Sequence, residues 1–409
     1  MSRIQLVSAS LLVAFAGAAL AAEVRLGPEK PLFPSGTPFF ELGTSLQVAR
    51  SGDHEIAIWA DQNYRIFATF DGVLQWIRQL PAGQGAFAPA VAAGNATFLA
   101  AWPEAENDGF RRVVAKRVTF DGRVLDASPI VLWTTTGGSW IGGGETPGIA
   151  SDGSSFLVSW IFNGSILTIR VAGDGSVGNL RTMPVVTPYD PKAVSVYSPK
   201  LVWTGSQFFL GCSLVHPNHF NCCSDGKFPP EAAIAGLPID TTRTVLPGSL
   251  SPLFDPIDLT GSHNVPMAMA FGAGRVTFAW NTLAIAQSTP DGIPLSGPHV
   301  IDLTPTRYCG DFAPAIDWDG ANFVTAWLDC DHSSVRALRL NVAGEPVDDT
   351  PFDVAIDALT TIPPSIVPTP EGVVIVYSRR DTITGLPRAF ERSLARLPPQ
   401  PMRRRGVTR

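Results

Sequence analysis

One sequence motif recurs along the chain and limits the folds that the chain can adopt. In its fullest copy, residues 313–327, an apolar run leads into Asp319 and Gly320, and a second apolar run ends at Trp327. Asp-Gly between two such runs predicts a tight β-hairpin, because the turn needs positive φ and glycine adopts it without strain. Repetition of this motif predicts a repeat protein in which every unit is a small sheet.

Seven copies can be aligned on the residue that ends the second strand. These residues are Trp59, Trp102, Trp160, Cys212, Trp280, Trp327 and Tyr377. Each unit of about fifty residues also holds a third strand and a short outer strand, the latter predicted at 129–133 in the second unit and 299–303 in the fifth. Seven four-stranded units predict an all-β fold, a β-propeller whose aromatic residues pack between neighbouring blades, with a solenoid as the alternative.

The last unit ends before its outer strand. We therefore expect the segment between Val24 and Leu42 to supply that strand and to pair near Phe390, which closes the ring.

The N-terminus predicts export. Arg3 precedes an apolar stretch, residues 6–20, and Ala19 and Ala21 form a small-residue cleavage site. We predict a signal peptide at 1–21, a single propeller domain at 22–396 and a disordered basic tail at 397–409. The localisation expected from this reading is secreted or periplasmic.

Composition excludes several classes of partner. Charged residues make up 16% of the chain and its net charge is −6, which argues against a nucleic-acid partner. No later stretch predicts a transmembrane helix. The sequence contains no phosphate loop, nucleophile elbow or EF-hand loop, so we expect no cofactor. We expect a monomer with an extracellular protein or glycan ligand.

Three units carry an acid two residues after the aromatic position, namely Asp61, Glu104 and Asp329. They fall on the face that carries the longer, variable loops, where scaffolds place function. They are candidate catalytic residues, because paired carboxylates bind sugar hydroxyls or act as general acid and base. The alternative is a structural role, in which each acid bonds to loop amides or to a neighbouring arginine. The Asp-Gly turns on the opposite face are interpreted as structural.

The five cysteines suggest disulfides, since an exported chain meets an oxidising compartment. Cys309 and Cys330 flank the hairpin of the sixth unit symmetrically and are predicted to pair. Cys212 is predicted to pair with Cys222 or Cys223. The same region also offers His216, His219, Cys222 and Cys223 as weak candidate zinc ligands, although their spacing matches no zinc template.

The chain resembles the secreted bacterial β-propeller repeat proteins in its recurring motif and in the Arg-Val-x-x-Asp-Gly sequence that follows it. The resemblance is best over 88–122, 147–175 and 313–344. The resemblance implies export and a propeller, and no particular activity. The first hypothesis is a non-catalytic binding or scaffolding module that uses its variable loop face. The second is a carbohydrate-active hydrolase or lyase with carboxylates near the central channel. The Asp-box order of sialidases is not met.

Overall fold

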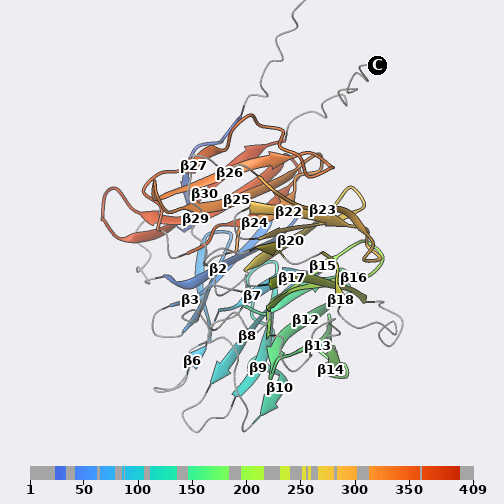
Figure 1. The fold of residues 1–409 in the computed structure, drawn as a ribbon. Helices are drawn as coiled ribbons and strands as arrows, with labels where there is room; N and C mark the ends of the chain where they lie inside the picture. Colours follow the sequence, from blue (N-terminus) through green and yellow to red (C-terminus); the bar gives the residue numbers. More distant parts are fainter. Residues whose placement is uncertain are drawn as a thin grey trace, which may run out of the picture.

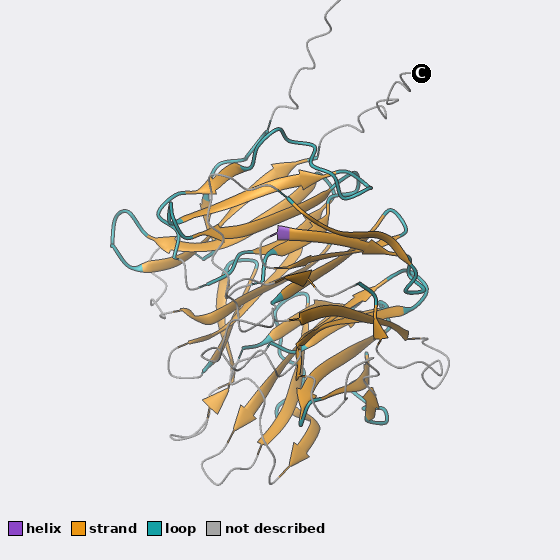
Figure 2. Cartoon of the chain, in the orientation of Figure 1, coloured by secondary structure: helices purple, strands orange, loops and turns teal. Residues whose placement is uncertain are grey.

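The computed structural model describes residues 24–33, 42–61, 65–78, 85–86, 88–105, 111–135, 146–183, 195–215, 231–239, 251–254, 257–258, 266–280, 283–301, 313–359 and 362–396. Apart from one helical residue, Leu283, this part of the chain consists of strands and the loops and turns between them (Figure 2). The strands form seven antiparallel sheets, which we call blades 1 to 7. The predicted signal peptide, residues 1–21, and the tail, 397–409, lie outside the described residues.

Blades 1 to 3 come first in the chain. Blade 1 contains β2 (Leu42–Ser51), β3 (His54–Asp61), β4 (Ile66–Phe70) and β5 (Val73–Arg78). Blade 2 contains β6 (Gly85–Ala86), β7 (Ala90–Ala93), β8 (Thr97–Ala105), β9 (Arg111–Thr119) and β10 (Ile130–Thr135), with β6 and β7 both paired to β8. Blade 3 contains β11 (Gly148–Ser151), β12 (Ser155–Phe162), β13 (Ser165–Ala172) and β14 (Arg181–Met183).

Blades 4 to 7 repeat this order. Blade 4 contains β15 (Ser195–Trp203), β16 (Phe208–Val215), β17 (Glu231–Ile239), β18 (Ser251–Pro252) and β19 (Ile257–Asp258). Blade 5 contains β20 (Met267–Gly272), β21 (Arg275–Trp280), β22 (Ala284–Ser288) and β23 (Pro294–Val300). Blade 6 contains β24 (Ala315–Trp318), β25 (Phe323–Asp329), β26 (Ser334–Leu340) and β27 (Phe352–Ala355). Blade 7 contains β28 (Ser365–Thr369), β29 (Gly372–Arg380), β30 (Pro387–Ala395) and the N-terminal β1 (Lys30–Pro31).

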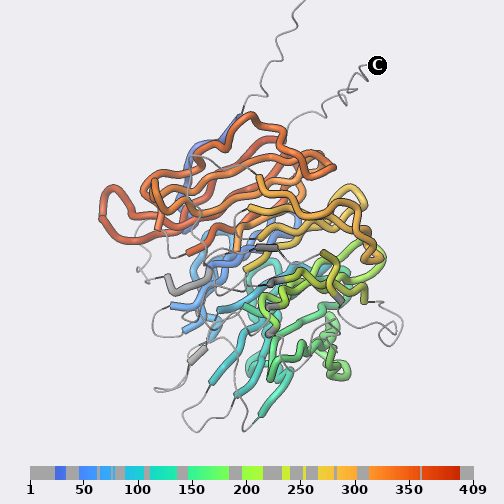
Figure 3. The backbone as a smooth tube through the Cα atoms, in the orientation of Figure 1, coloured from blue at the N-terminus to red at the C-terminus, as the bar shows by residue number. Residues whose placement is uncertain are grey.

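The blades form a closed ring. The first strand of each blade contacts the first strand of the next, from β2 through β7, β11, β15, β20, β24 and β28 back to β2. The chain passes from sheet to sheet in sequence order, and its blue beginning lies against its red end (Figures 1 and 3). In β1, Lys30 is the register partner of Glu391 and Pro31 is that of Phe390. The predicted seven-bladed propeller and its closure by the N-terminal segment are confirmed.

The aromatic position of each unit packs where two blades meet. There are seven hydrophobic clusters among the described residues, one at each junction between consecutive blades. Trp102, for example, packs with Ile58 and Phe70 of the preceding blade, and Tyr377 packs with Val324 of blade 6. Cys212 occupies the same place between blades 3 and 4. Stacking the faces of small sheets in this way buries apolar surface that no single blade could cover alone.

The Asp-Gly turns have the predicted structural role. In blade 6, Gly320 has a φ of +95°, and Asp319, which is 2% exposed, accepts hydrogen bonds from the amides of Ala321 and Asn322 at 2.7 and 2.6 Å. The predicted outer strand at 299–303 is displaced, since β23 already begins at Pro294. The register of β23 against β22 shifts twice, so β23 follows the Asp291-Gly292 turn directly in an irregular strand.

Candidate functional site

The three candidate acids lie where the second strand of a blade ends, which is the loop-bearing face of the ring. Glu104 is 1% exposed and accepts hydrogen bonds from three donors. Arg78 Nε of blade 1 lies 2.9 Å away, Arg112 Nε of the neighbouring strand 2.6 Å, and Trp102 Nε1 3.0 Å. Glu104 therefore ties blade 1 to blade 2 and fixes the indole at their junction.

Asp61 and Asp329 are held in a similar way. Asp61, 3% exposed, accepts bonds from the amide and the Nε of Arg65 at 2.9 and 2.6 Å. Asp329 is fully buried, accepts a bond from the Asp331 amide at 3.1 Å and lies 2.9 Å from His332 Nδ1. These contacts are the ones that the structural alternative describes, and the catalytic role of the three acids stays a prediction. Each is bonded within its own blade or to the adjacent one, at the base of a different loop.

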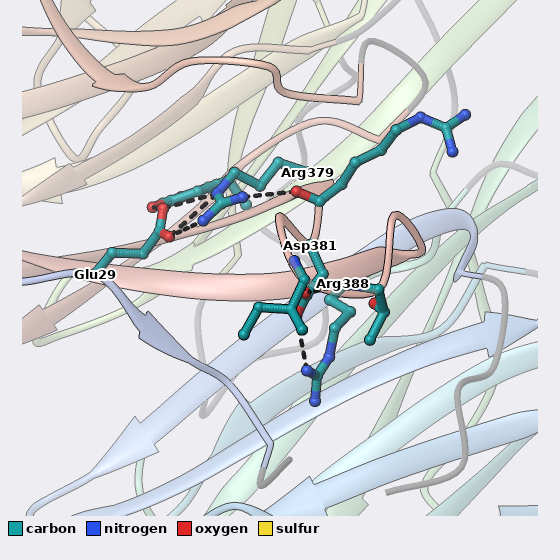
Figure 4. A network of polar contacts seen from close by, with 8 residues as sticks. Glu29, Arg379, Asp381 and Arg388 are labelled. Carbon is teal, nitrogen blue, oxygen red and sulfur yellow. Dashed lines mark hydrogen bonds and ion pairs between the residues drawn. The ribbon is translucent and has the colours of Figure 1, made fainter. Parts of the chain in front are cut away.

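Blade 7 has an ion pair at the same position, with the acid and the arginine exchanged. Arg379 occupies the place of the acid, and Glu29 from the N-terminal segment supplies the carboxylate (Figure 4). Glu29 accepts hydrogen bonds from Arg379 Nε at 3.0 Å and from the Tyr377 hydroxyl at 2.6 Å. Burial raises the pKa of Glu29, but the hydrogen bonds from Arg379 and Tyr377 outweigh it and hold the pKa below its ordinary value. The sequence shows Arg379 at this position but gives no sign that its partner lies at the other end of the chain.

A second ion pair orders the turn that follows β29. Asp381 accepts bonds from the amides of Ile383 and Thr384 at 2.8 and 2.9 Å and from Arg388 Nη1 at 2.8 Å (Figure 4). The Thr384 amide, then Arg388 and the Ile383 amide, lower the pKa of Asp381 to about 2. This turn presents Ile383 with 93% of its surface exposed.

The cysteine predictions fall largely outside the described residues. Cys212 is buried in β16, while Cys222 and Cys223 lie in the undescribed segment 216–230, so that pairing stays a prediction. Cys330 follows β25, and Cys309 is undescribed, so this disulfide also stays a prediction. The candidate zinc ligands His216 and His219 lie in the same undescribed segment. Among the residues that the structure describes, no group of three or more potential ligands is placed to hold a metal ion.

A partly buried acid in a blade's first strand departs from the repeat. Asp317 in β24 pairs with Val324, three residues before the aromatic position. The other six units have alanine or valine there: Ala49, Ala92, Ala150, Val202, Ala270 and Val367. Burial raises the pKa of Asp317 to about 7, and the hydrogen bond from the Trp318 amide offsets this only in part.

A cavity of about 480 Å³ lies where blade 7, the N-terminal segment and blade 1 meet. We call it the seam pocket. Its walls come from Arg25, Leu26, Gly27, Pro28, Lys30, Arg50, Thr369, Glu371, Val374, Glu391, Ser393, Leu394 and Ala395. Arg50 precedes the turn between β2 and β3, and Glu371 lies in the turn between β28 and β29. The pocket is therefore on the turn face, which the sequence analysis interprets as structural.

Comparisons with known proteins support the fold. No family model and no curated protein matches the sequence. Among solved structures, Penicillium chrysogenum α-L-arabinanase complexed with arabinobiose matches with a TM-score of 0.50 and 11% identity, over 78% of this chain and 98% of that one. A fucose-specific lectin from Aleuria aurantia has a TM-score of 0.41 and 11% identity over 78% and 97% of the two chains.

A prolyl endopeptidase matches over 86% of this chain, with a TM-score of 0.39 and 12% identity. This chain spans 46% of that longer protein. At such identities the likeness concerns the fold alone. No helix among the described residues is long and apolar enough to cross a membrane.

Proposed function

We propose that the protein is an exported, non-catalytic binding module that presents its ligand site on the loop-bearing face. One observation carries this proposal. The carboxylates that the sequence offers for catalysis are 3%, 1% and 0% exposed, and each is already bonded to arginine, histidine or amide donors.

A hydrolase needs the opposite arrangement. Its two carboxyl groups face a pocket, roughly 5–10 Å apart, with room for a sugar or a water molecule between them. Asp61, Glu104 and Asp329 come from blades 1, 2 and 6 and point into the protein. The arabinanase shares the fold with this chain, and its activity is not carried over.

The ion pairs support a role in which the blades present their loops to a ligand. In blades 1, 2, 6 and 7 an arginine–carboxylate pair holds the strand ends from which a loop leaves the sheet. Rigid stems lower the entropy cost of ordering a loop when it binds, and they allow the loops to differ without disturbing the blades. The ligand classes that fit an exported module of this kind are glycans and extracellular proteins.

The experiment is a binding screen of the mature protein against glycan and extracellular-protein libraries. It is repeated with a variant in which segments 106–110 and 136–145 are replaced by Gly-Ser linkers. We expect a ligand that the native protein retains and the loop variant loses, at an unchanged melting temperature. Asp121→Asn, at an exposed turn on the opposite face, is the control and should bind like the native protein. Equal retention by the loop variant, or no retained ligand, contradicts the proposal.

A further inference from the structure

The seam pocket arises from the way the ring is closed. The N-terminal segment completes blade 7 over a short stretch only, through β1 and the bridge between Leu26 and Leu394. The Gly27 amide donates to the Ser393 carbonyl at 2.7 Å, and a Cβ at Gly27 would lie 2.2 Å from Ser393 Oγ. Glycine thus brings the segment close to β30, and the space left beside blade 1 is the cavity.

The walls of the pocket combine cations with hydrogen-bond acceptors. Arg25, Lys30 and Arg50 contribute three positive charges, and Glu371 and Glu391 contribute two negative ones. Leu26, which is partly exposed, adds apolar surface beside them, whereas Val374 and Leu394 are buried beneath the wall. These walls match a ligand that has an anionic group, several hydroxyl donors and an apolar face.

Arg50 differs from the arginines on the loop-bearing face. Its nearest carboxylate is Glu55, with 3.9 Å between Arg50 Nε and Glu55 Oε2, and neither atom has a hydrogen-bond partner. The loop-face arginines Arg65, Arg78 and Arg112 instead donate at 2.6–2.9 Å. The Nε atom itself is buried, but the Arg50 side chain is 26% exposed and lines the pocket, so the outer part of the guanidinium can add a ligand carboxylate as a partner.

The electrostatics around Arg50 favour an anion. Burial, and then the neighbouring Glu391 carboxylate, raise the pKa of Glu55 to about 7, while Arg50 opposes this rise and Asp71 adds to it. Near neutral pH, Glu55 therefore neutralises Arg50 only in part.

We propose that the seam pocket binds an acidic saccharide of one or two rings, such as a uronic-acid sugar. Arg50 and Lys30 take its carboxylate, Glu371 and Glu391 accept from its hydroxyls, and the ring lies against Leu26. The volume suits a two-ring ligand, because pockets of about 300–1,000 Å³ enclose most of a small organic molecule. The site is on the face opposite the loops and is independent of the proposed loop-face ligand.

The test is calorimetric titration of the full mature chain with digalacturonate, against the neutral digalactose as the control ligand. We expect digalacturonate to bind at least about tenfold more tightly than digalactose, and the difference to shrink as salt is added. Arg50→Gln should weaken digalacturonate binding by about tenfold, the equivalent of one charge-assisted hydrogen bond. Arg123→Gln, at an exposed arginine outside the pocket, should leave it unchanged.

Each alternative outcome overturns the proposal. Equal binding of the neutral sugar, no heat with digalacturonate at millimolar concentration, or unchanged binding by Arg50→Gln would each do so. Preferential binding of a zwitterionic dipeptide over digalacturonate would also do so. The same titration on the loop variant separates the two sites, since loss of the loop-face ligand should leave digalacturonate binding intact.

Discussion

Replacement of Asp317 by alanine should stabilise the protein above neutral pH. Six of the seven units already have alanine or valine at this register position, so the site accepts a small apolar side chain. Ala315, two residues earlier on the same side of β24, packs against the cluster between blades 6 and 7. Asp317 thus places an ionisable group where the repeat buries apolar surface.

The magnitude follows from the pKa. Burial raises the pKa of Asp317 from 3.8 to about 7. At 1.36 kcal/mol for each unit of difference, the charged form costs the folded state roughly 4 kcal/mol at most. Asp317 is partly exposed, so the measured value should be smaller. Because the folded protein retains this proton between pH 3.8 and 7 and the unfolded chain does not, its stability falls as pH rises through that window.

The assay is urea unfolding of the native protein, Asp317→Ala and the isosteric Asp317→Asn between pH 3.5 and 8.5. We expect the gain in unfolding free energy of the variants over the native protein to be small below pH 4. It should grow to a few kcal/mol at pH 8. Asp349→Asn, at an exposed carboxylate, is the control and should follow the native curve. A gain that does not change with pH, or a loss of stability at pH 8, would contradict this prediction.

Four further predictions concern the N-terminal segment, the ion pairs and the cysteines. Glu29→Ala should lower the free energy of unfolding by roughly 2–3 kcal/mol, because it removes the carboxylate that accepts from Arg379 and the Tyr377 hydroxyl. Deletion of residues 22–42 should lower the melting temperature further. An unchanged melting temperature in calorimetry would contradict the closure by β1. Glu104→Gln should cost about 3 kcal/mol in urea unfolding, since two partly buried arginines lose their counter-charge; a cost below about 0.5 kcal/mol would mean that the pair is solvated. Mass spectrometry of the mature protein should find Cys309 joined to Cys330, and free thiols at both positions would rule this disulfide out.

Local patterns in the sequence predict much of the fold. The aromatic at the end of each second strand locates all seven junctions between blades, including the one where Cys212 replaces it, because packing between sheets needs an apolar residue at a fixed register. The Asp-Gly pairs predict hairpins, because only the local backbone decides them. The outer strand of blade 5 is misplaced because β23 contains Pro294, Gly297 and Pro298, a composition that does not predict a strand.

The sites were harder to predict because they join distant parts of the chain. Glu29 meets Arg379 across nearly the whole sequence, and the seam pocket takes its walls from the N-terminal segment, blade 1 and blade 7. In the sequence, Asp61, Glu104 and Asp329 suggest a catalytic role because their partners are not apparent there. The arginines that neutralise Glu104, for example, come from β5 and β9. Asp317 could have been found from the sequence, as the one acid at an otherwise apolar register position.

The claim that these buried acids support the fold and do not catalyse is tested most directly by reducing-end release. The mature protein is incubated for a day with a panel of plant and bacterial polysaccharides, beside Glu104→Gln and Asp329→Asn. We expect no release above the protein-free control with any of the three proteins, together with lower melting temperatures for the two variants. Release that scales with the native protein and disappears in a folded variant would contradict it.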